Sequence, residues 1–111
     1  MEAKNNKVDF KGKVVYISGK ISGLEKREYM KHFSDAEEFI RRHNGIPVNP
    51  AIFGEMYYPF IGYFPTLKAC ISMLDGCDAI YMLKGYEDSY GAMSELGHAK
   101  VAEMDIFYED E

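Results

Sequence analysis

The chain has 111 residues, of which 47% are hydrophobic and 28% are charged. This length suits one domain with a single core, and it is too short for two domains or a β/α barrel. The 18 acidic residues outnumber the 13 lysines and arginines, giving a net charge of −5. Proteins that bind a nucleic-acid polymer usually have a basic face, and no cluster of Lys and Arg indicates one here. A small anion held by backbone N–H groups is compatible with this charge.

Cys70 and Cys77 are the two cysteines, and their spacing matches neither a secreted disulfide framework nor a zinc site. We expect two free thiols in a reducing compartment. The polar N-terminal segment has no apolar stretch like that of a signal peptide, and no run approaches the ~20 apolar residues of a membrane span. The sequence therefore predicts a cytoplasmic protein with no membrane partner. We expect a single domain over residues 1–111, with 1–12 as a flexible or edge segment.

The first half of the chain alternates strand and helix patterns. The β-branched and aromatic run Val14–Ser18 predicts a buried strand, followed by the glycine-bounded turn of residues 19–23. Residues 25–42 carry apolar side chains at spacings of four, three and four, which is typical of an amphipathic helix. The side chains of this stripe are Tyr29, Phe33, Ala36 and Ile40. Ile46–Val48 predicts a second, short strand.

Residues 49–64 show neither a helical nor a strand period, and they contain six aromatic residues and two prolines. We therefore expect a long aromatic loop, and loops of this length in compact domains are often functional. The rings suit either stacking on a nucleobase or packing in a dimer interface. This segment is accordingly expected to carry part of a ligand pocket or of a subunit interface.

The second half of the chain continues the alternation. It predicts a helix from about Pro65 to Asp75 and then a buried strand at 79–83. A second helix follows, with Asp88 or Ser89 as its N-cap and with Ala92, Leu96 and Ala99 on one face. The last predicted element is a strand at Asp105–Tyr108. Such alternation predicts an α/β fold with a parallel sheet of four to five strands and helices on both faces. Ligands of such folds bind beyond the carboxyl ends of the strands. Residues 19–23, the segment after Val48 and residues 84–91 should meet there.

Glu95 is the main candidate for chemistry, because it shares the apolar helix face of Ala92 and Ala99. A carboxylate on a packed face is costly unless it is held. Either it faces a pocket as nucleophile or base, or it lies at the edge of the stripe and hydrogen-bonds a neighbour. Tyr16 is either a core residue or a hydroxyl at the cleft. Ser89 suits either an anion site or a plain helix cap.

The three histidines have no metal-ligand spacing, so neither a metal nor a cofactor is expected. Taken together, however, several segments carry a resemblance. They are residues 15–23 (VYISGKISG), residues 48–51 (VNPA), residues 77–83 (CDAIYML), residues 85–92 (GYEDSYGA) and Glu95. This series resembles an uncharacterised bacterial and phage family within the nucleoside 2-deoxyribosyltransferase-like superfamily.

The resemblance implies a flavodoxin-like sheet and a pocket for a small nucleoside or nucleotide. In the characterised relatives, a Tyr on the first strand and a Glu on a late helix belong to the active site, and these roles fall on Tyr16 and Glu95. The Glu attacks the anomeric carbon of a deoxyribosyl group and expels the base. The remaining matched positions imply contacts with the sugar, phosphate or base: Gly19, Ile21, Ser22, Gly23, Asn49, Asp88, Ser89 and Gly91. The superfamily also suggests a homo-oligomer.

One position departs from the relatives' pattern. Their second carboxylate, eight residues before Asp78, falls on Cys70, and a thiol cannot replace a carboxylic acid as the general acid at neutral pH. Either Asp75, Asp78 or Asp88 substitutes, or catalysis is weak or lost. The predicted function is therefore N-glycosidic bond cleavage or deoxyribosyl transfer, and the alternative is a binding module for a nucleotide-like ligand. An interaction protein without a ligand would explain Glu95 poorly.

Overall fold

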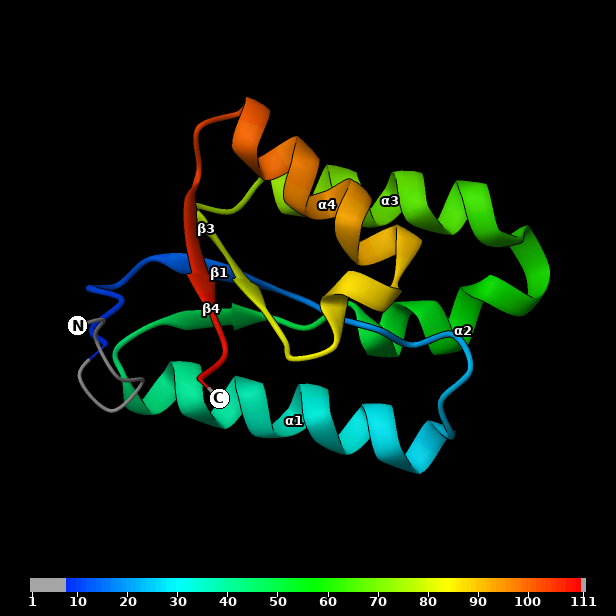
Figure 1. The fold of residues 1–111 in the computed structure, drawn as a ribbon, viewed down its shortest axis with the longest axis horizontal. Coiled ribbons are helices and arrows are strands. Elements are labelled where there is room, and N and C mark those ends of the chain that lie inside the picture. Colours follow the sequence, from blue (N-terminus) through cyan, green and yellow to red (C-terminus); the bar gives the residue numbers. More distant parts are fainter. Residues whose placement is uncertain (1–7, 111) are drawn as a thin grey trace.

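The structure is a computed structural model that describes residues 8–110. Its centre is a sheet of four parallel strands in the order β2-β1-β3-β4. The strands are β1 (Val14–Ser18), β2 (Ile46–Val48), β3 (Ala79–Met82) and β4 (Asp105–Tyr108). Helices connect successive strands and cover both faces of the sheet (Figure 1). The predicted α/β, flavodoxin-like architecture is confirmed, with four strands.

Helix α1 (Lys26–Arg42) covers one face of the sheet. Its four stripe residues are all buried, as their spacing predicted. They pack with Val15 and Ile17 of β1 and with Phe10, which is fully buried. The N–H of Phe10 also donates to the carbonyl of His43 at 2.8 Å. Val8 and Phe10 therefore pack against the core, whereas residues 1–7 of the expected N-terminal segment lie outside the described residues.

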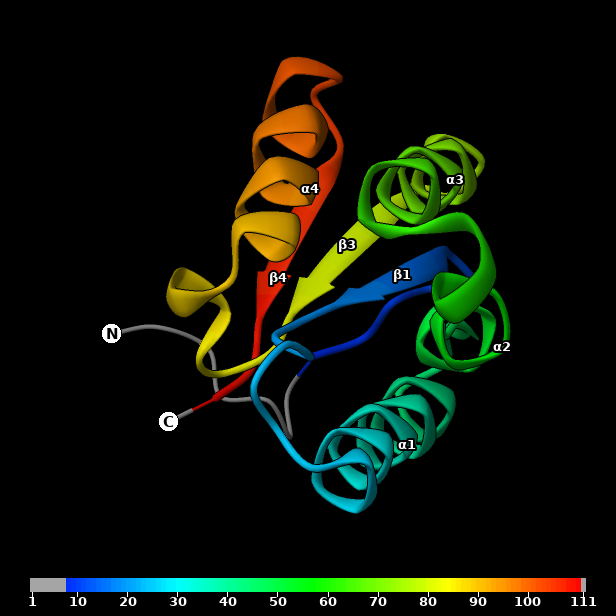
Figure 2. The same cartoon turned by 90° about the vertical axis from the view of Figure 1, so that its right-hand side faces the viewer.

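Helices α3 (Tyr63–Asp75) and α4 (Tyr90–Val101) cover the opposite face, which Figure 2 shows on the far side of the sheet from α1. Their buried side chains pack against alternate residues of the central strands and form a second core cluster. Its buried members from strands and helices are Tyr16, Cys70, Leu74, Ile80, Met82, Ala92, Leu96 and Ala99. The strand alternation thus sends Tyr16 toward α3 and α4 and sends its neighbours Val15 and Ile17 toward α1.

The prediction of an aromatic loop over residues 49–64 is wrong, because most of it is helix α2 (Ala51–Ile61). Ala51 is the one buried residue of α2, so the sequence of this helix shows no apolar stripe. In addition, Gly54 and Pro59, which usually mark loops, lie inside the helix. Gly62, with φ of 85°, ends α2 and turns the chain into α3. The helical period is hidden because this helix lies at the side of the sheet with most of its surface outside the core (Figure 2).

The connection from β3 to α4 contains a 3₁₀ turn at Tyr86–Asp88, where a polar loop was expected. Ser89 is the N-cap of α4, and Asp75 is the last residue of α3, both as predicted. Cys70 and Cys77 are free thiols. Within residues 8–110, no helix has the length and apolar character needed to cross a bilayer.

Candidate functional site

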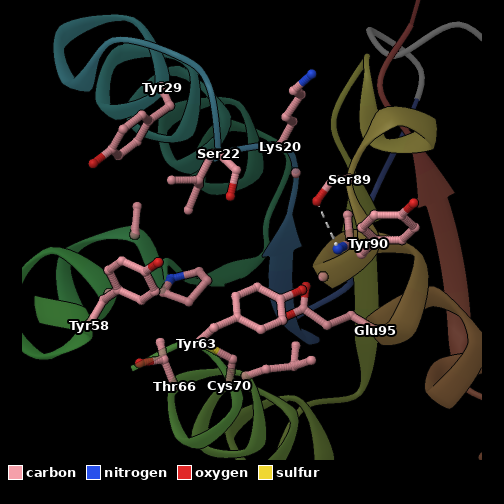
Figure 3. A pocket seen from close by; sticks show the side chains of 18 of the residues that line it. Lys20, Ser22, Tyr29, Tyr58, Tyr63, Thr66, Cys70, Ser89, Tyr90 and Glu95 are labelled. Atoms are coloured by element: carbon pink, nitrogen blue, oxygen red, sulfur yellow. Dashed lines mark hydrogen bonds between the residues drawn. The ribbon is translucent and has the colours of Figure 1, made fainter. Parts of the chain in front are cut away.

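A pocket of about 1010 Å³ opens at the carboxyl end of the sheet. Its walls come from the turn after β1, from α2 and the start of α3, and from the first turns of α4. The three segments that the sequence placed at this edge therefore do meet. Figure 3 shows Tyr58 on one side of the pocket, Ser89, Tyr90 and Glu95 on the other, and Tyr63 between them.

Glu95 is held on the pocket wall by two hydroxyl groups from β1. The Tyr16 hydroxyl donates to Oε2 at 2.7 Å, and the Ser18 hydroxyl donates to Oε1 at 2.6 Å. Tyr16 and Ser18 lie two residues apart in a strand, so their side chains leave the same face of the sheet. Glu95 lies one turn inside α4 and is 7% exposed. The carboxylate is thus fixed in orientation and still borders the cavity.

Burial raises the pKa of the Glu95 carboxyl, although the hydrogen bonds from Ser18 and Tyr16 act in the opposite direction. The sequence left open which effect is larger, and in the structure burial is larger. Burial also raises the pKa of the Tyr16 hydroxyl well above its ordinary value, and the charge of Glu95 adds to this rise. Tyr16 therefore stays a protonated donor at neutral pH.

Cys70 lies beside this pair, on the face of α3 that packs against the sheet. Its side chain borders the pocket, although the residue is only 9% exposed. Burial raises the pKa of the Cys70 thiol and the charge of Glu95 adds to the rise, whereas a hydrogen bond with Tyr16 lowers it. Cys70 thus places a thiol beside Tyr16, at the position where the sequence comparison with the relatives put a second carboxyl group.

The N-terminal end of α4 borders the same pocket. The Ser89 hydroxyl accepts a hydrogen bond from the N–H of Ala92 at 3.1 Å, so it caps the helix (Figure 3). Gly91 follows, and a β-carbon there would lie 3.5 Å from the Tyr63 hydroxyl. The first turn of α4 is therefore close to the first turn of α3 across the pocket.

The turn after β1 forms the third wall. A hydrogen bond from Leu24 N–H to the Ile21 carbonyl at 3.1 Å closes it, and Gly23 adopts a φ of +84° that favours glycine. Gly19 is required for a different reason, since a β-carbon there would lie 2.8 Å from Cδ1 of Leu83. The predicted ligand residues Gly19, Ile21, Ser22 and Gly23 all line the pocket.

A family model described as a domain of unknown function (DUF4406) matches residues 13–108. The chain belongs to the DUF4406 family. The matched range contains all four strands and every pocket wall described above. No curated protein matches the chain.

Two predicted site residues of this DUF4406 domain lie elsewhere. Asp78 precedes β3, at the amino end of the sheet, where its carboxylate accepts from the N–H of Val14 at 2.9 Å. It does not line the pocket, because the site lies at the other end of the same strand. Asn49 also stays outside the pocket lining, since its side-chain oxygen accepts from the N–H of Ala51 at 2.9 Å. Asp75, another suggested substitute, contacts His98 instead.

The sequence missed several pocket residues of the DUF4406 domain. Glu55 lines the pocket from α2 and pairs with Lys26 at 3.2 Å, and it was overlooked because α2 was expected to be a loop. Ser18 was read only as the end of a strand, although the period of two links it to Tyr16. Asp88, Ser89 and Gly91 do line the pocket, as expected. Within residues 8–110, no three side chains of the usual metal-ligand types are gathered.

Proposed function

We propose that this protein cleaves or transfers the N-glycosidic bond of a nucleoside or nucleotide through Glu95. The observation that carries the proposal is the buried Glu95 carboxylate, with hydroxyl donors at 2.7 and 2.6 Å, on the wall of a pocket large enough for such a ligand. A carboxylate that serves stability alone is rarely buried with only neutral partners, because burial of an unpaired charge is costly. A functional reason for retaining it is therefore favoured.

In the proposed reaction, a Glu95 oxygen attacks the anomeric carbon and forms a glycosyl ester, which water or an acceptor then opens. Tyr16 and Ser18 orient the carboxylate by their hydrogen bonds. The turn of residues 19–23 holds the sugar. A phosphate, where the ligand has one, lies at the N-terminal end of α4 beside Ser89, where the helix dipole and free N–H groups favour an anion. This arrangement agrees with the resemblance to the nucleoside 2-deoxyribosyltransferase-like superfamily, and we propose membership of it.

The test is to incubate the purified protein with 2′-deoxynucleosides and their 5′-monophosphates and to measure release of the free base by chromatography. We expect base release by the wild type and loss of it in Glu95→Gln, which keeps the shape of the side chain. Glu38→Gln is the matched control, because Glu38 is exposed on α1 and does not line the pocket. Base release that survives in Glu95→Gln contradicts the proposed nucleophile.

The second candidate is a binding module for the same ligands that has no catalytic activity. Cys70 favours it, because a buried thiol occupies the place where a second carboxyl group was expected. Calorimetry separates the two functions. Binding of a nucleoside to the wild type with no base released under any condition would support the module, whereas turnover that depends on Glu95 would exclude it.

We also propose that the protein is a homo-oligomer, and that its partner is a second copy seated on α2. Large apolar side chains are exposed along this helix and its corner with α3, including Phe60 at 84% and Phe64 at 71%. Glu55 is the one charged residue of α2, and it is paired with Lys26 and not directed to a partner. Low charge and exposed aromatic side chains are characteristic of interface centres. A cytoplasmic location remains a prediction from the sequence.

A further inference from the structure

The groups that touch Glu95 are poor acids at neutral pH. Two are the hydroxyls of Tyr16 and Ser18, and the third group in this corner is the Cys70 thiol. Burial raises the pKa of both Tyr16 and Cys70, so neither releases a proton readily to a departing base. Enzymes that break bonds to ordinary nucleobases generally protonate the base as it leaves, and such acid catalysis is worth about 10²–10⁴-fold.

The other carboxyl groups on the pocket wall do not fill this role. The Glu55 carboxylate lies 3.2 Å from the ammonium group of Lys26, so it is engaged by that lysine, and it projects from α2 and not from α4, which carries Glu95. Asp88 lies on an exposed turn at the pocket margin, and the hydrogen-bond partners of Glu95 are Tyr16 and Ser18 instead. Among the described residues that line the cavity, no second carboxyl group is therefore held against Glu95 to protonate a leaving base.

The pocket lining is also negative and aromatic. Its charged side chains are three carboxylates, Glu55, Asp88 and Glu95, against one ammonium group, Lys20. Lys26 offsets Glu55 from outside the lining, which still leaves two carboxylates against one lysine. Seven aromatic residues line the same pocket: Tyr16, Tyr29, Phe33, Tyr58, Tyr63, Phe64 and Tyr90. Carboxylates and aromatic faces both attract cations, and they do so more strongly where water is excluded.

We propose that the substrate is a nucleoside whose base carries a positive charge in the ring that is bonded to the sugar, such as a pyridinium or an N7-alkylated purine. The inference rests on the proposed function, since it assigns a substrate class to the same Glu95 pocket. A base of this kind needs no acid to leave. The negative, aromatic lining would bind it in preference to a neutral base of the same size.

The reaction balances without a proton donor. A Glu95 oxygen bonds to the anomeric carbon while the bond from that carbon to the ring nitrogen breaks. The electron pair of that bond stays with the nitrogen and cancels the positive charge, so the base leaves as a neutral molecule. Water then attacks the same carbon, the ester bond to Glu95 breaks, and the proton lost by the water passes to solvent. The products are the free pentose, the neutral base and one proton.

The experiment compares cationic nucleosides with neutral partners of matched shape. The pairs are nicotinamide riboside against dihydronicotinamide riboside and 7-methylguanosine against guanosine, each also as the 2′-deoxynucleoside. Because a charged base leaves more easily in water too, each rate is divided by the spontaneous rate in the same buffer. We expect this rate enhancement to be at least about 100-fold larger for the cationic member, which is the lower end of what an acid contributes. The two pairs distinguish a pyridinium from a purinium ligand.

Binding is measured on Glu95→Gln, which should retain the pocket without turnover, and on the wild type. We expect the cationic member to bind the wild type at least about tenfold more tightly than its neutral partner, with a smaller preference in Glu95→Gln, which loses one of the two unpaired carboxylates, and with the preference weakening as salt is added. Equal rate enhancements and equal affinities within both pairs would overturn the inference while leaving the proposed function intact. If nothing is cleaved, the proposed function fails, and the affinities alone decide the ligand class: equal values overturn the cationic ligand, and a tenfold preference supports it.

Discussion

The Tyr16 hydroxyl lies 2.7 Å from Oε2 of Glu95, although 79 positions separate the two residues in the sequence. The contact joins the central strand β1 to α4 across the face of the sheet that α3 also covers. It fixes the position of one carboxylate at the carboxyl end of the sheet, where α/β folds bind ligands. Variants of this pair therefore report on stability and on the proposed chemistry at the same time.

Tyr16→Phe should lower base release by about 10- to 100-fold, because a hydrogen bond to a buried charge is worth about 1.5–3 kcal/mol. Loss of this donor disfavours the ionised form of Glu95, so the carboxyl pKa should rise. Since the nucleophile acts when ionised, the acidic limb of the pH–rate profile should move to higher pH. Tyr81→Phe is the control, because Tyr81 is buried in the same sheet on the opposite face. An unmoved acidic limb in Tyr16→Phe would contradict the role of the hydroxyl.

Glu95→Gln should increase the stability of the protein relative to the wild type as pH rises. Burial raises the folded-state pKa of Glu95 above its ordinary value of 4.5. The carboxyl therefore stabilises the fold fully below about 4.5, and this contribution is lost as pH rises through the folded-state pKa. Glutamine has no such dependence and can keep both hydroxyl partners, donating to one and accepting from the other.

Urea unfolding of both proteins from pH 4 to pH 8 measures this effect, in steps of about 1 unit. The free energy of unfolding of Glu95→Gln minus that of the wild type should grow across the window above about 4.5 and then level off. A difference that shrinks with rising pH would show that the hydrogen bonds from Tyr16 and Ser18 outweigh burial.

Gly19→Ala should destabilise the fold by about 1–3 kcal/mol, since the new β-carbon would lie 2.8 Å from Leu83 Cδ1 and 3.0 Å from its Cβ. The Leu83 side chain is 1% exposed, so it has little room to move. Gly97→Ala is the matched control. Gly97 lies inside α4 with nothing within 4 Å of its β position, so alanine there should stabilise by up to about 1 kcal/mol. Thermal and urea unfolding measure both, and equal effects of the same sign would refute the packing explanation.

Phe60→Asp should shift the proposed oligomer toward monomers, with an apparent dissociation constant at least about tenfold higher. The reason is that Phe60 is 84% exposed near the C-terminal end of α2, among the other exposed apolar side chains of this helix. Val101→Asp is the control, because Val101 is 86% exposed at the far end of α4. Light scattering coupled to size exclusion gives the masses. A monomeric wild type at the highest concentration tested would overturn the oligomer and its interface together.

The sequence predicted the sheet and its helices wherever one face of an element is buried. The stripe of α1 predicted its buried face residue by residue, and Glu95 was located because it shares a face with Ala92 and Ala99. Prediction failed for α2, where a single residue is buried and no period is left to detect. The position of Asp78 was misjudged for another reason, since its place before β3 puts it at the amino end of the strand. Glu55 was missed because the helix that carries it was missed.

Cys70→Asp should accelerate the cleavage of neutral nucleosides, for which the wild type has the smaller rate enhancement. The substitution places a carboxyl group beside Glu95 and Tyr16, in a corner where the residue is 9% exposed. Two carboxyl groups that close together cannot both ionise easily, so one of them should hold a proton at neutral pH and be able to donate it to a departing base. We expect the rate enhancement for guanosine and 2′-deoxyguanosine to rise by about 10²-fold or more, as an added general acid allows. Cleavage of cationic nucleosides should change little, because their bases need no proton.

Cys70→Asn is the matched control, since asparagine has the same shape as aspartic acid and no acidic proton. Circular dichroism and urea unfolding establish that both variants fold. A folded Cys70→Asp that gains no activity toward neutral nucleosides would contradict the idea that the missing acid limits the substrate range.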